Sequence, residues 1–107
     1  MTYKAVITRE AQREYESIVS YLASTLLSPA AANDFMNEFD HQITLVCEMP
    51  LMHPLSHLPE LAALGYRPIH IKRYVALYKV TNDKIVIAHI FHQTQDYARL
   101  VWGSAFL

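Results

Sequence analysis

The sequence predicts one α+β domain with the element order β-α-α-β-β-β, in which a helical hairpin packs on one face of an antiparallel sheet. Two apolar stripes at helical spacing stand in the first half of the chain. Three runs rich in β-branched and aromatic residues follow in the second half. The length of 107 residues fits a single domain, so we assign residues 1–107 to one unit.

The first half begins with a strand and continues with the hairpin. Residues 3–8 form the expected strand, and Thr8 can cap the helix that follows. Ser28 and Pro29 mark a second helix start, because Ser is a favoured N-cap and Pro fits the first helical position. Pro50 ends this helix. The two apolar stripes are Ala11, Tyr15, Ile18, Leu22 and Leu26, and Ala32, Phe35, Phe39, Ile43 and Val46.

A loop and an edge strand come next. Residues 49–65 contain three prolines and show no clear period, which is typical of a loop with one short helical turn at 60–64. The run 66–71 favours strand residues but is interrupted by Pro68. Because proline cannot donate a hydrogen bond to a neighbouring strand, this run suits the edge of the sheet.

Two clear strands complete the sheet. Residues 74–80 and 85–92 flank a tight turn at 81–84, and the second of these strands is apolar enough to be central. The tail holds one candidate short helix, at 96–101. No second helical layer is predicted for the other face of the sheet, which leaves it exposed to solvent, used for binding or covered by a partner.

Composition excludes several classes of protein. Apolar residues make up 52% and charged residues 18% of the chain, which rules out an intrinsically disordered protein. No apolar run has the roughly 18 residues of a membrane-spanning helix, and no signal peptide is visible. The one cysteine, Cys47, cannot form an internal disulfide. We therefore expect a cytoplasmic protein without membrane contact.

The net charge of −1 hides a split between the two halves. Residues 9–48 sum to −5 and residues 49–107 to +3, and Lys4 supplies the remainder. From Arg67 to Lys79 there are four basic residues and no acid. A local basic surface of this kind attracts phosphates, although ordinary solvated charge explains the pattern equally well.

The six histidines supply a candidate acid or base but no metal motif. His53 and His57 lie in the proline-rich loop, where the helical geometry of a metal site is not expected. His41 suits a helix surface and His89 a strand core. His92 ends the last strand, where a reactive group can be rigid yet exposed and can carry protons at neutral pH. A plain surface histidine is the alternative, and no cofactor site is recognisable.

Tyrosines interleave with the basic residues of the second half. Arg67, Lys72 and Arg73 stand among them, an arrangement that suits stacking on bases and binding of backbone phosphates in a nucleic acid. Tyrosine is also simply a good strand former, so the sheet alone explains the pattern equally well. The tyrosines in question are Tyr3, Tyr66, Tyr74, Tyr78 and Tyr97.

The order and spacing of these segments resemble the RelE/ParE toxins of bacterial type II toxin–antitoxin modules. The likeness covers about residues 2–101, including the first strand and a helix with Ala11 in its first turn. The segments that carry it further are Glu48-Met49-Pro50, Gly65-Tyr66-Arg67, the strand Tyr74 to Val80, the Asn82-Asp83 turn, Ile90-Phe91-His92 and Asp96-Tyr97.

The resemblance implies a single RelE/ParE-like toxin domain with a helical hairpin against a curved antiparallel sheet. It also implies a cognate antitoxin, encoded beside the toxin, that wraps it with a helix or an extended segment. RelE-like members cut messenger RNA on the ribosome without a metal or cofactor, as mRNA interferases, whereas ParE-like members inhibit DNA gyrase. The alternative from another class is a non-catalytic interaction module that still binds its antitoxin. A homodimer is the rival assembly when the antitoxin is absent.

The resemblance also assigns roles to particular side chains if the chain is an endoribonuclease. Arg67 would bind the phosphate and stabilise transition-state charge, His92 would act as general acid or base, and Tyr97 would stack on a base or transfer a proton. The expected RNA-binding residues are Lys72, Arg73 and Tyr74.

Two departures from the family pattern remove basic residues that a RelE-like nuclease is expected to have. Val75 stands where an arginine is often found, and Thr94-Gln95 replaces a basic pair that often follows the histidine position. The strong positive charge of these toxins is also missing. These losses fit a gyrase-type toxin, a weak nuclease or a decayed toxin that still binds its partner.

Overall fold

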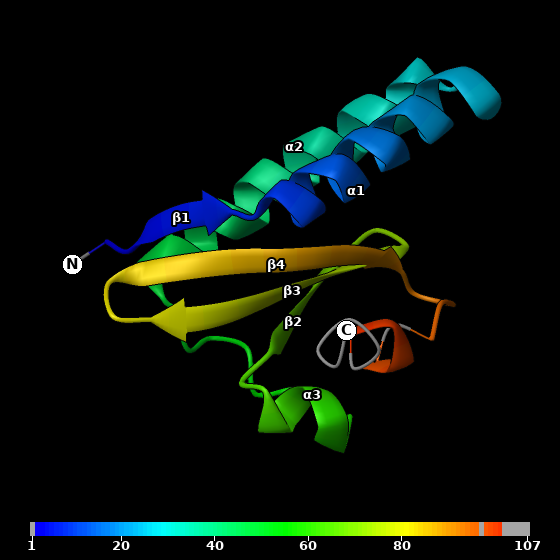
Figure 1. Ribbon diagram of the computed structural model, residues 1–107. Coiled ribbons are helices and arrows are strands. Elements are labelled where there is room, and N and C mark those ends of the chain that lie inside the picture. Colours follow the sequence, from blue (N-terminus) through cyan, green and yellow to red (C-terminus); the bar gives the residue numbers. More distant parts are fainter. Residues whose placement is uncertain (1, 97, 102–107) are drawn as a thin grey trace.

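The computed structural model describes residues 2–96 and 98–101 and has two layers, with a helical hairpin on a four-stranded sheet (Figure 1). This architecture and the predicted element order are confirmed, and residues 98–101 add the expected short C-terminal helix. The elements are β1 (Lys4–Ile7), α1 (Arg9–Ser20), the π-helical turn η1 (Tyr21–Thr25), α2 (Pro29–Glu48), α3 (Pro59–Ala63), β2 (Arg67–Ile71), β3 (Tyr74–Thr81) and β4 (Lys84–His92).

Both long helices begin at the predicted caps. The Thr8 hydroxyl accepts a hydrogen bond from the Ala11 amide at 3.1 Å, and the Ser28 hydroxyl accepts one from the Ala31 amide at 3.2 Å. Pro29 occupies the first turn of α2. Each cap satisfies an amide that the first helical turn leaves without a partner, so these local signals fix where the hairpin starts.

The turn between the two helices is less regular than the sequence indicates. The Leu26 amide donates to the Tyr21 carbonyl at 3.0 Å, which is the five-residue spacing of a π-helix. Leu27 then takes a left-handed φ of 49°, and the chain reverses direction before Ser28. The apolar spacing of the first helix does not reveal this turn, because it fits an α-helix equally well.

The strand order is β1-β4-β3-β2, so β4 is central as predicted. β2, which contains Pro68, lies at the predicted edge, and β2, β3 and β4 are antiparallel. β1 pairs with β4 in parallel, from Lys4 opposite Lys84 to Ile7 opposite Ile87. The sheet is therefore mixed, because the chain crosses to the far edge through the hairpin and β4 arrives beside β1 in the same direction.

A β-bulge interrupts the pairing of β3 with β4. Tyr78 lies opposite Ile87, but the residue before it in β3, Leu77, lies opposite His89. Ala88 is therefore an extra residue in β4. Because successive side chains alternate between faces, the extra residue moves every later side chain of β4 to the other face of the sheet.

The main core lies between the helical hairpin and the sheet. Both predicted apolar stripes contribute to it, except that Leu26 stays 52% exposed at the tip of the hairpin. Its buried members are Ala11, Leu22, Ala32, Phe35, Phe39, Val46, Cys47, Ile69, Ile71, Tyr74, Ala76, Tyr78, Ile85, Ile87 and Ile90.

The opposite face of the sheet is not as bare as the sequence predicts. Leu61 from α3 and Val101 from the C-terminal helix pack there against Val75, Leu77 and Phe91. Both covering segments are very short, so their apolar residues give no helical period to detect. No helix among the described residues is long and apolar enough to cross a membrane.

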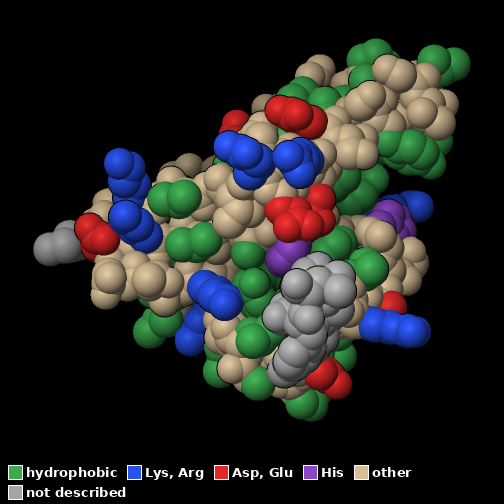
Figure 2. Space-filling model, viewed as in Figure 1, with side chains coloured by type: hydrophobic (Ala, Val, Ile, Leu, Met, Phe, Trp, Pro, Cys, Tyr) green, Lys and Arg blue, Asp and Glu red, His purple; other side chains and the backbone are tan. Residues whose placement is uncertain are grey.

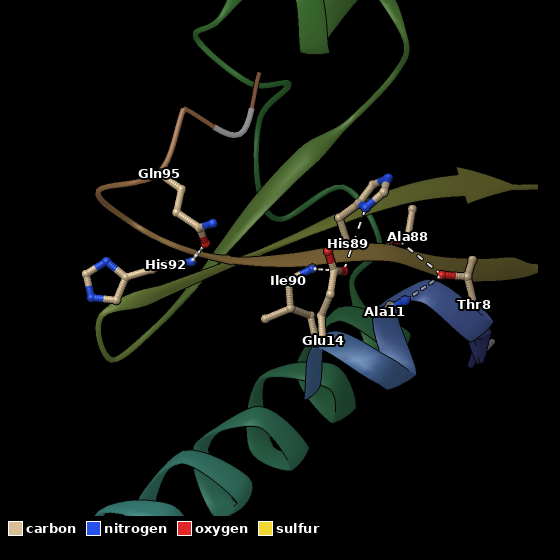
Figure 3. A network of polar contacts seen from close by, with 8 residues as sticks. All are labelled: Thr8, Ala11, Glu14, Ala88, His89, Ile90, His92 and Gln95. Atoms are coloured by element: carbon tan, nitrogen blue, oxygen red, sulfur yellow. Dashed lines mark hydrogen bonds and ion pairs between the residues drawn. The ribbon is translucent and has the colours of Figure 1, made fainter. Parts of the chain in front are cut away.

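Side chains close the edge of β4 beyond the point where β1 ends (Figure 3). The Thr8 hydroxyl donates to the Ala88 carbonyl at 3.1 Å, and a Glu14 carboxylate oxygen accepts the Ile90 amide at 2.9 Å. The Gln95 side-chain oxygen then accepts the His92 amide at 2.8 Å. Helix α1 and the segment after β4 thus replace a neighbouring strand, and no strand edge stays open there.

The same Glu14 oxygen lies 3.7 Å from Nδ1 of His89. His89 is only 9% exposed, which confirms the predicted strand-core histidine, and its ring stacks on Phe91. Nδ1 has no hydrogen-bond partner among the described residues. The carboxylate therefore accepts a backbone hydrogen bond from β4 and lies beside the buried imidazole.

We predict that Glu14→Ala destabilises the protein by about 1–3 kcal/mol, because it leaves the Ile90 amide without an acceptor. Glu14→Gln keeps an oxygen at the same place, so its cost should be about 1 kcal/mol or less. Urea unfolding followed by circular dichroism measures both changes.

Glu16→Ala is the matched control, since this exposed acid on α1 accepts a side-chain hydrogen bond from Gln12 and from no other described residue. It should change the unfolding free energy by less than about 0.5 kcal/mol. Equal losses in Glu14→Ala and Glu16→Ala would contradict the role given to the Glu14 carboxylate.

Candidate functional site

A groove of about 640 Å³ lies between the helical hairpin and the turn that joins β2 to β3. The hairpin reaches beyond the sheet at this end, as Figure 1 shows. The hairpin side of the groove is mostly apolar but also carries Ser17 and the exposed acid Asp34, whereas its rim at the turn carries Lys72 and Arg73. Other lining side chains include Ile18, Tyr21, Leu22, Phe35, Tyr74 and His92.

His92 reaches this groove at the end of β4. The Thr94 amide donates to Nδ1 at 3.2 Å, and the Thr94 hydroxyl lies 2.7 Å from the same atom. Because an amide can only donate, Nδ1 is an acceptor and the neutral ring carries its proton on Nε2. The Tyr74 ring packs edge-on at a centroid distance of 5.3 Å. The imidazole is therefore held in one tautomer and one orientation.

Lys72 and Arg73 form the turn between β2 and β3. Lys72 has a left-handed φ of 57°, and the Gln93 amide donates to the Arg73 carbonyl at 2.8 Å. This bond ties the turn to the residue that follows His92. Both cationic side chains are exposed, and neither has an ion-pair partner within the described ranges. Two free cations therefore flank the imidazole.

Tyr74 completes the group from within the core. Its ring is 9% exposed and packs edge-on against Phe35 at 5.2 Å. Burial raises the pKa of the phenol, nearby Tyr21 adds to the rise, and the Arg73 cation opposes it. The phenol is therefore protonated at neutral pH and can donate a hydrogen bond. The structure thus brings together Lys72, Arg73, Tyr74 and His92.

Arg67 lies apart from these four residues. Arg67 pairs with Tyr78, whereas His92 pairs with Tyr74, which lies four residues earlier in β3. Four residues of strand correspond to about 13 Å. The Arg67 guanidinium donates through Nη1 to the His53 carbonyl at 2.6 Å. Arg67 therefore anchors the loop after α2 in this structure. Tyr97, the remaining predicted site residue, lies outside the described residues.

Sequence reasoning missed the contribution of the helical hairpin to this groove. Ile18 and Leu22 fit a core stripe, and nothing in their spacing distinguishes a groove wall from a core. In the structure Tyr21 and Leu27 are 47% and 80% exposed. The only available signal was the pair Leu26-Leu27, which places two large apolar side chains at a helix end beyond the reach of the sheet.

The described residues contain no cluster of three or more His, Cys, Asp or Glu side chains that could hold a metal ion. His53 and His57, for which the sequence predicts no metal site, lie in the loop between α2 and α3.

Comparison with known proteins gives one family match. The family described as ParE toxin of type II toxin–antitoxin system, parDE, matches residues 5–97 of this chain. No curated protein sequence matches the chain.

Several solved structures share the fold. The chain is similar to the chromosomal ParDE toxin–antitoxin system from P. aeruginosa, with a TM-score of 0.68, 18% identity, and coverage of 85% of this chain and 96% of that one. The E. coli DinJ-YafQ toxin-antitoxin complex has a TM-score of 0.55 and 17% identity, and the match covers 87% of this chain and 94% of that one. The structure of YafQ from E. coli has a TM-score of 0.53 and 19% identity, and the match covers 85% of this chain and 93% of that one. At such identities the likeness shows a common fold only.

The loop that Arg67 anchors contains a half-buried titratable group, His53. His53 Nε2 is buried and has no hydrogen-bond partner among the described residues. Burial lowers the pKa of this imidazole, and nearby His70 lowers it further. The Tyr78 hydroxyl donates to the Pro50 carbonyl at 2.8 Å, so the same loop is tied to the sheet at a second point.

We predict that the unfolding free energy decreases as the pH falls below about 6.5, the pKa of an unperturbed histidine. In this range the unfolded chain takes up a proton on His53 that the folded protein resists, so acid favours unfolding. His53→Gln should flatten this slope, and it keeps the backbone carbonyl that Arg67 binds.

Urea unfolding between pH 7.5 and 5.0 gives the slopes, at intervals of about half a pH unit. His41→Gln, on the exposed surface of α2, should leave the slope unchanged. The same pH slope in the wild type and His53→Gln would contradict the prediction.

Proposed function

Since this chain belongs to the ParE toxin family of type II toxin–antitoxin systems, we propose that it arrests bacterial growth by binding and inhibiting DNA gyrase. The toxin would act in the cytoplasm, where gyrase is found. A cognate antitoxin would neutralise it, as the ParDE and DinJ-YafQ neighbours are themselves toxin–antitoxin systems.

The position of Arg67 carries the choice of a binding mechanism over RNA cleavage. Cleavage through a 2′-hydroxyl needs an acid, a base and a cation on the phosphorane, all at one phosphate. Arg67 stands about 13 Å along the sheet from the His92 end, and its guanidinium is bound to the His53 carbonyl. A surface that only binds a protein does not require this convergence, so the arrangement supports inhibition by binding.

The contact with gyrase would use the rim of the groove. Lys72 and Arg73 are exposed beside the apolar wall of the hairpin, where Tyr21 and Leu26 are about half exposed. Exposed apolar side chains beside unpaired cations are typical of a surface that binds another protein. We therefore assign target binding to this rim.

The antitoxin would occupy the same groove. An amphipathic segment with apolar side chains and one or two carboxylates matches its apolar wall and cationic rim. Such a segment would cover Lys72, Arg73 and His92 together. Neutralisation would then follow from direct competition for the surface that binds the target.

A second candidate function rests on the grouping of Lys72, Arg73, Tyr74 and His92. Two cations could bind RNA phosphates, the Tyr74 phenol could donate a hydrogen bond, and His92 could transfer a proton through Nε2. This would make the chain a ribosome-dependent, metal-independent endoribonuclease. The fixed tautomer of His92 is the observation in its favour.

We predict that the purified toxin inhibits gyrase supercoiling and leaves messenger RNA intact on programmed ribosomes. The double variant Lys72→Ala/Arg73→Ala should weaken inhibition at least about tenfold, equivalent to about 1.4 kcal/mol of binding. The matched control Arg9→Ala/Arg13→Ala removes two exposed cations from α1 and should inhibit like the wild type.

Other outcomes separate the remaining candidates. Cleavage of ribosome-bound RNA that falls about 10²–10⁴-fold in His92→Ala would establish the nuclease instead. Normal growth on expression, together with an intact complex with the product of the neighbouring gene, would show an inactive interaction module.

A further inference from the structure

Three lysines gather on the sheet face that points away from the helical hairpin. Lys4 lies opposite Lys84 across β1 and β4, and Lys79 lies opposite Val86 across β3 and β4. Val86 also pairs with Val6, which is 37% exposed. Figure 2 shows basic side chains around hydrophobic ones near the end of the sheet that holds the β3–β4 turn. We call Lys4, Lys79, Lys84, Val6 and Val86 the lysine face.

The lysine face is unfavourable for an isolated molecule. Like charges directly opposite each other on neighbouring strands repel, as Lys4 and Lys84 do here. None of the three lysines has an ion-pair partner among residues 2–96 and 98–101. The Lys79 ammonium instead lies over the Tyr66 ring, 4.5 Å from its centroid. Asp83 is also exposed in the turn beside Lys84, but none of the three lysines forms an ion pair with it within the described ranges, so this face presents three cations against one acid.

Helix α2 has the opposite character. Over Pro29–Glu48 it contains four acids and no lysine or arginine. Three of these acids are exposed: Asp34 lines the groove, whereas Asp40 and Glu48 lie on the solvent side with His41 and Thr44. Glu48 lies in the last turn, where a negative charge is disfavoured by the helix dipole. Like the lysine face, this stripe carries charge at a cost to the isolated fold.

We propose that the lysine face of one copy binds the Asp40–Glu48 stripe of α2 in a second copy of this chain. Eight residues of helix separate the two acids by about 12 Å. Two strand spacings and two residues of rise separate Lys4 from Lys79 by about the same distance, 12 Å. Lys4 and Lys84 can therefore face one acid while Lys79 faces the other.

The contact is head-to-tail. α2 packs on the sheet face that carries Ile85 and Ile87, whereas Lys84 and Val86 point to the other face. The two surfaces therefore lie on opposite sides of the molecule. A pair of copies leaves the α2 stripe of one copy and the lysine face of the other free for further contacts. The association should be weak and sensitive to salt, because exposed ion pairs contribute little and are screened. The proposal does not depend on the target of the toxin.

Sedimentation velocity of the full chain tests the proposal. The weight-average sedimentation coefficient should rise with protein concentration at about 10 mM salt, where the Debye length is about 30 Å, and not at about 1 M, where it is about 3 Å. A lysine-face variant, Lys4→Glu/Lys84→Glu, and a helix variant, Asp40→Lys/Glu48→Lys, should each raise the dissociation constant at least about tenfold.

Mixing the two variants provides the decisive comparison. The acidic sheet face of the first variant then meets the basic helix of the second, so the equimolar mixture should regain concentration-dependent association. The control Arg9→Glu/Arg13→Glu reverses two exposed charges on α1 and should associate like the wild type. A monomeric wild type at low salt would overturn the proposal. So would a mixture that stays monomeric, or a control that is weakened as much as the lysine-face variant.

Discussion

The extra residue in β4, Ala88, is the constraint on which the site depends. Without it, the tight β3–β4 turn would place Phe91 opposite Tyr74, and His92 would point to the other face of the sheet. With it, His92 pairs with Tyr74 and its ring lines the groove. A single residue in a central strand therefore decides whether an imidazole or a benzyl group stands beside Lys72 and Arg73.

Helix α1 holds this bulge in place. β1 stops pairing with β4 at Ile87, just before the extra residue, and two side chains then take over. Thr8 both caps the helix and donates to the Ala88 carbonyl, and Glu14 accepts the Ile90 amide. The same helix forms one wall of the groove. The hairpin and the strand that carries His92 are thus positioned by the same few hydrogen bonds.

Local signals in the sequence were enough for much of the fold. The caps at Thr8 and Ser28, Pro68 at the sheet edge and the turn at Asn82 each act within a few residues, and each is confirmed. The parallel pairing of β1 was not visible in the same way, because it joins segments about 80 residues apart and no local rule sets its direction.

The site was predictable only in part, because local signals do not show which distant segments come together. Lys72, Arg73 and Tyr74 are neighbours in the chain, and the hairpin register brings His92 to them across β3. Arg67 is close to Lys72 in sequence but lies at the other end of the strand, where the His53 carbonyl binds it. The hairpin wall was hidden, since a groove and a core use the same apolar spacing.

The register of β3 against β4 is the most direct test of this account. The Gln93 amide bonds to the Arg73 carbonyl, so Tyr74 and His92 form the closely spaced type of antiparallel pair. Nuclear Overhauser spectra of the wild-type protein should therefore show a strong contact between the Hα protons of Tyr74 and His92. A strong contact between the Hα protons of Tyr74 and Phe91 in its place would contradict the bulge and the site built on it.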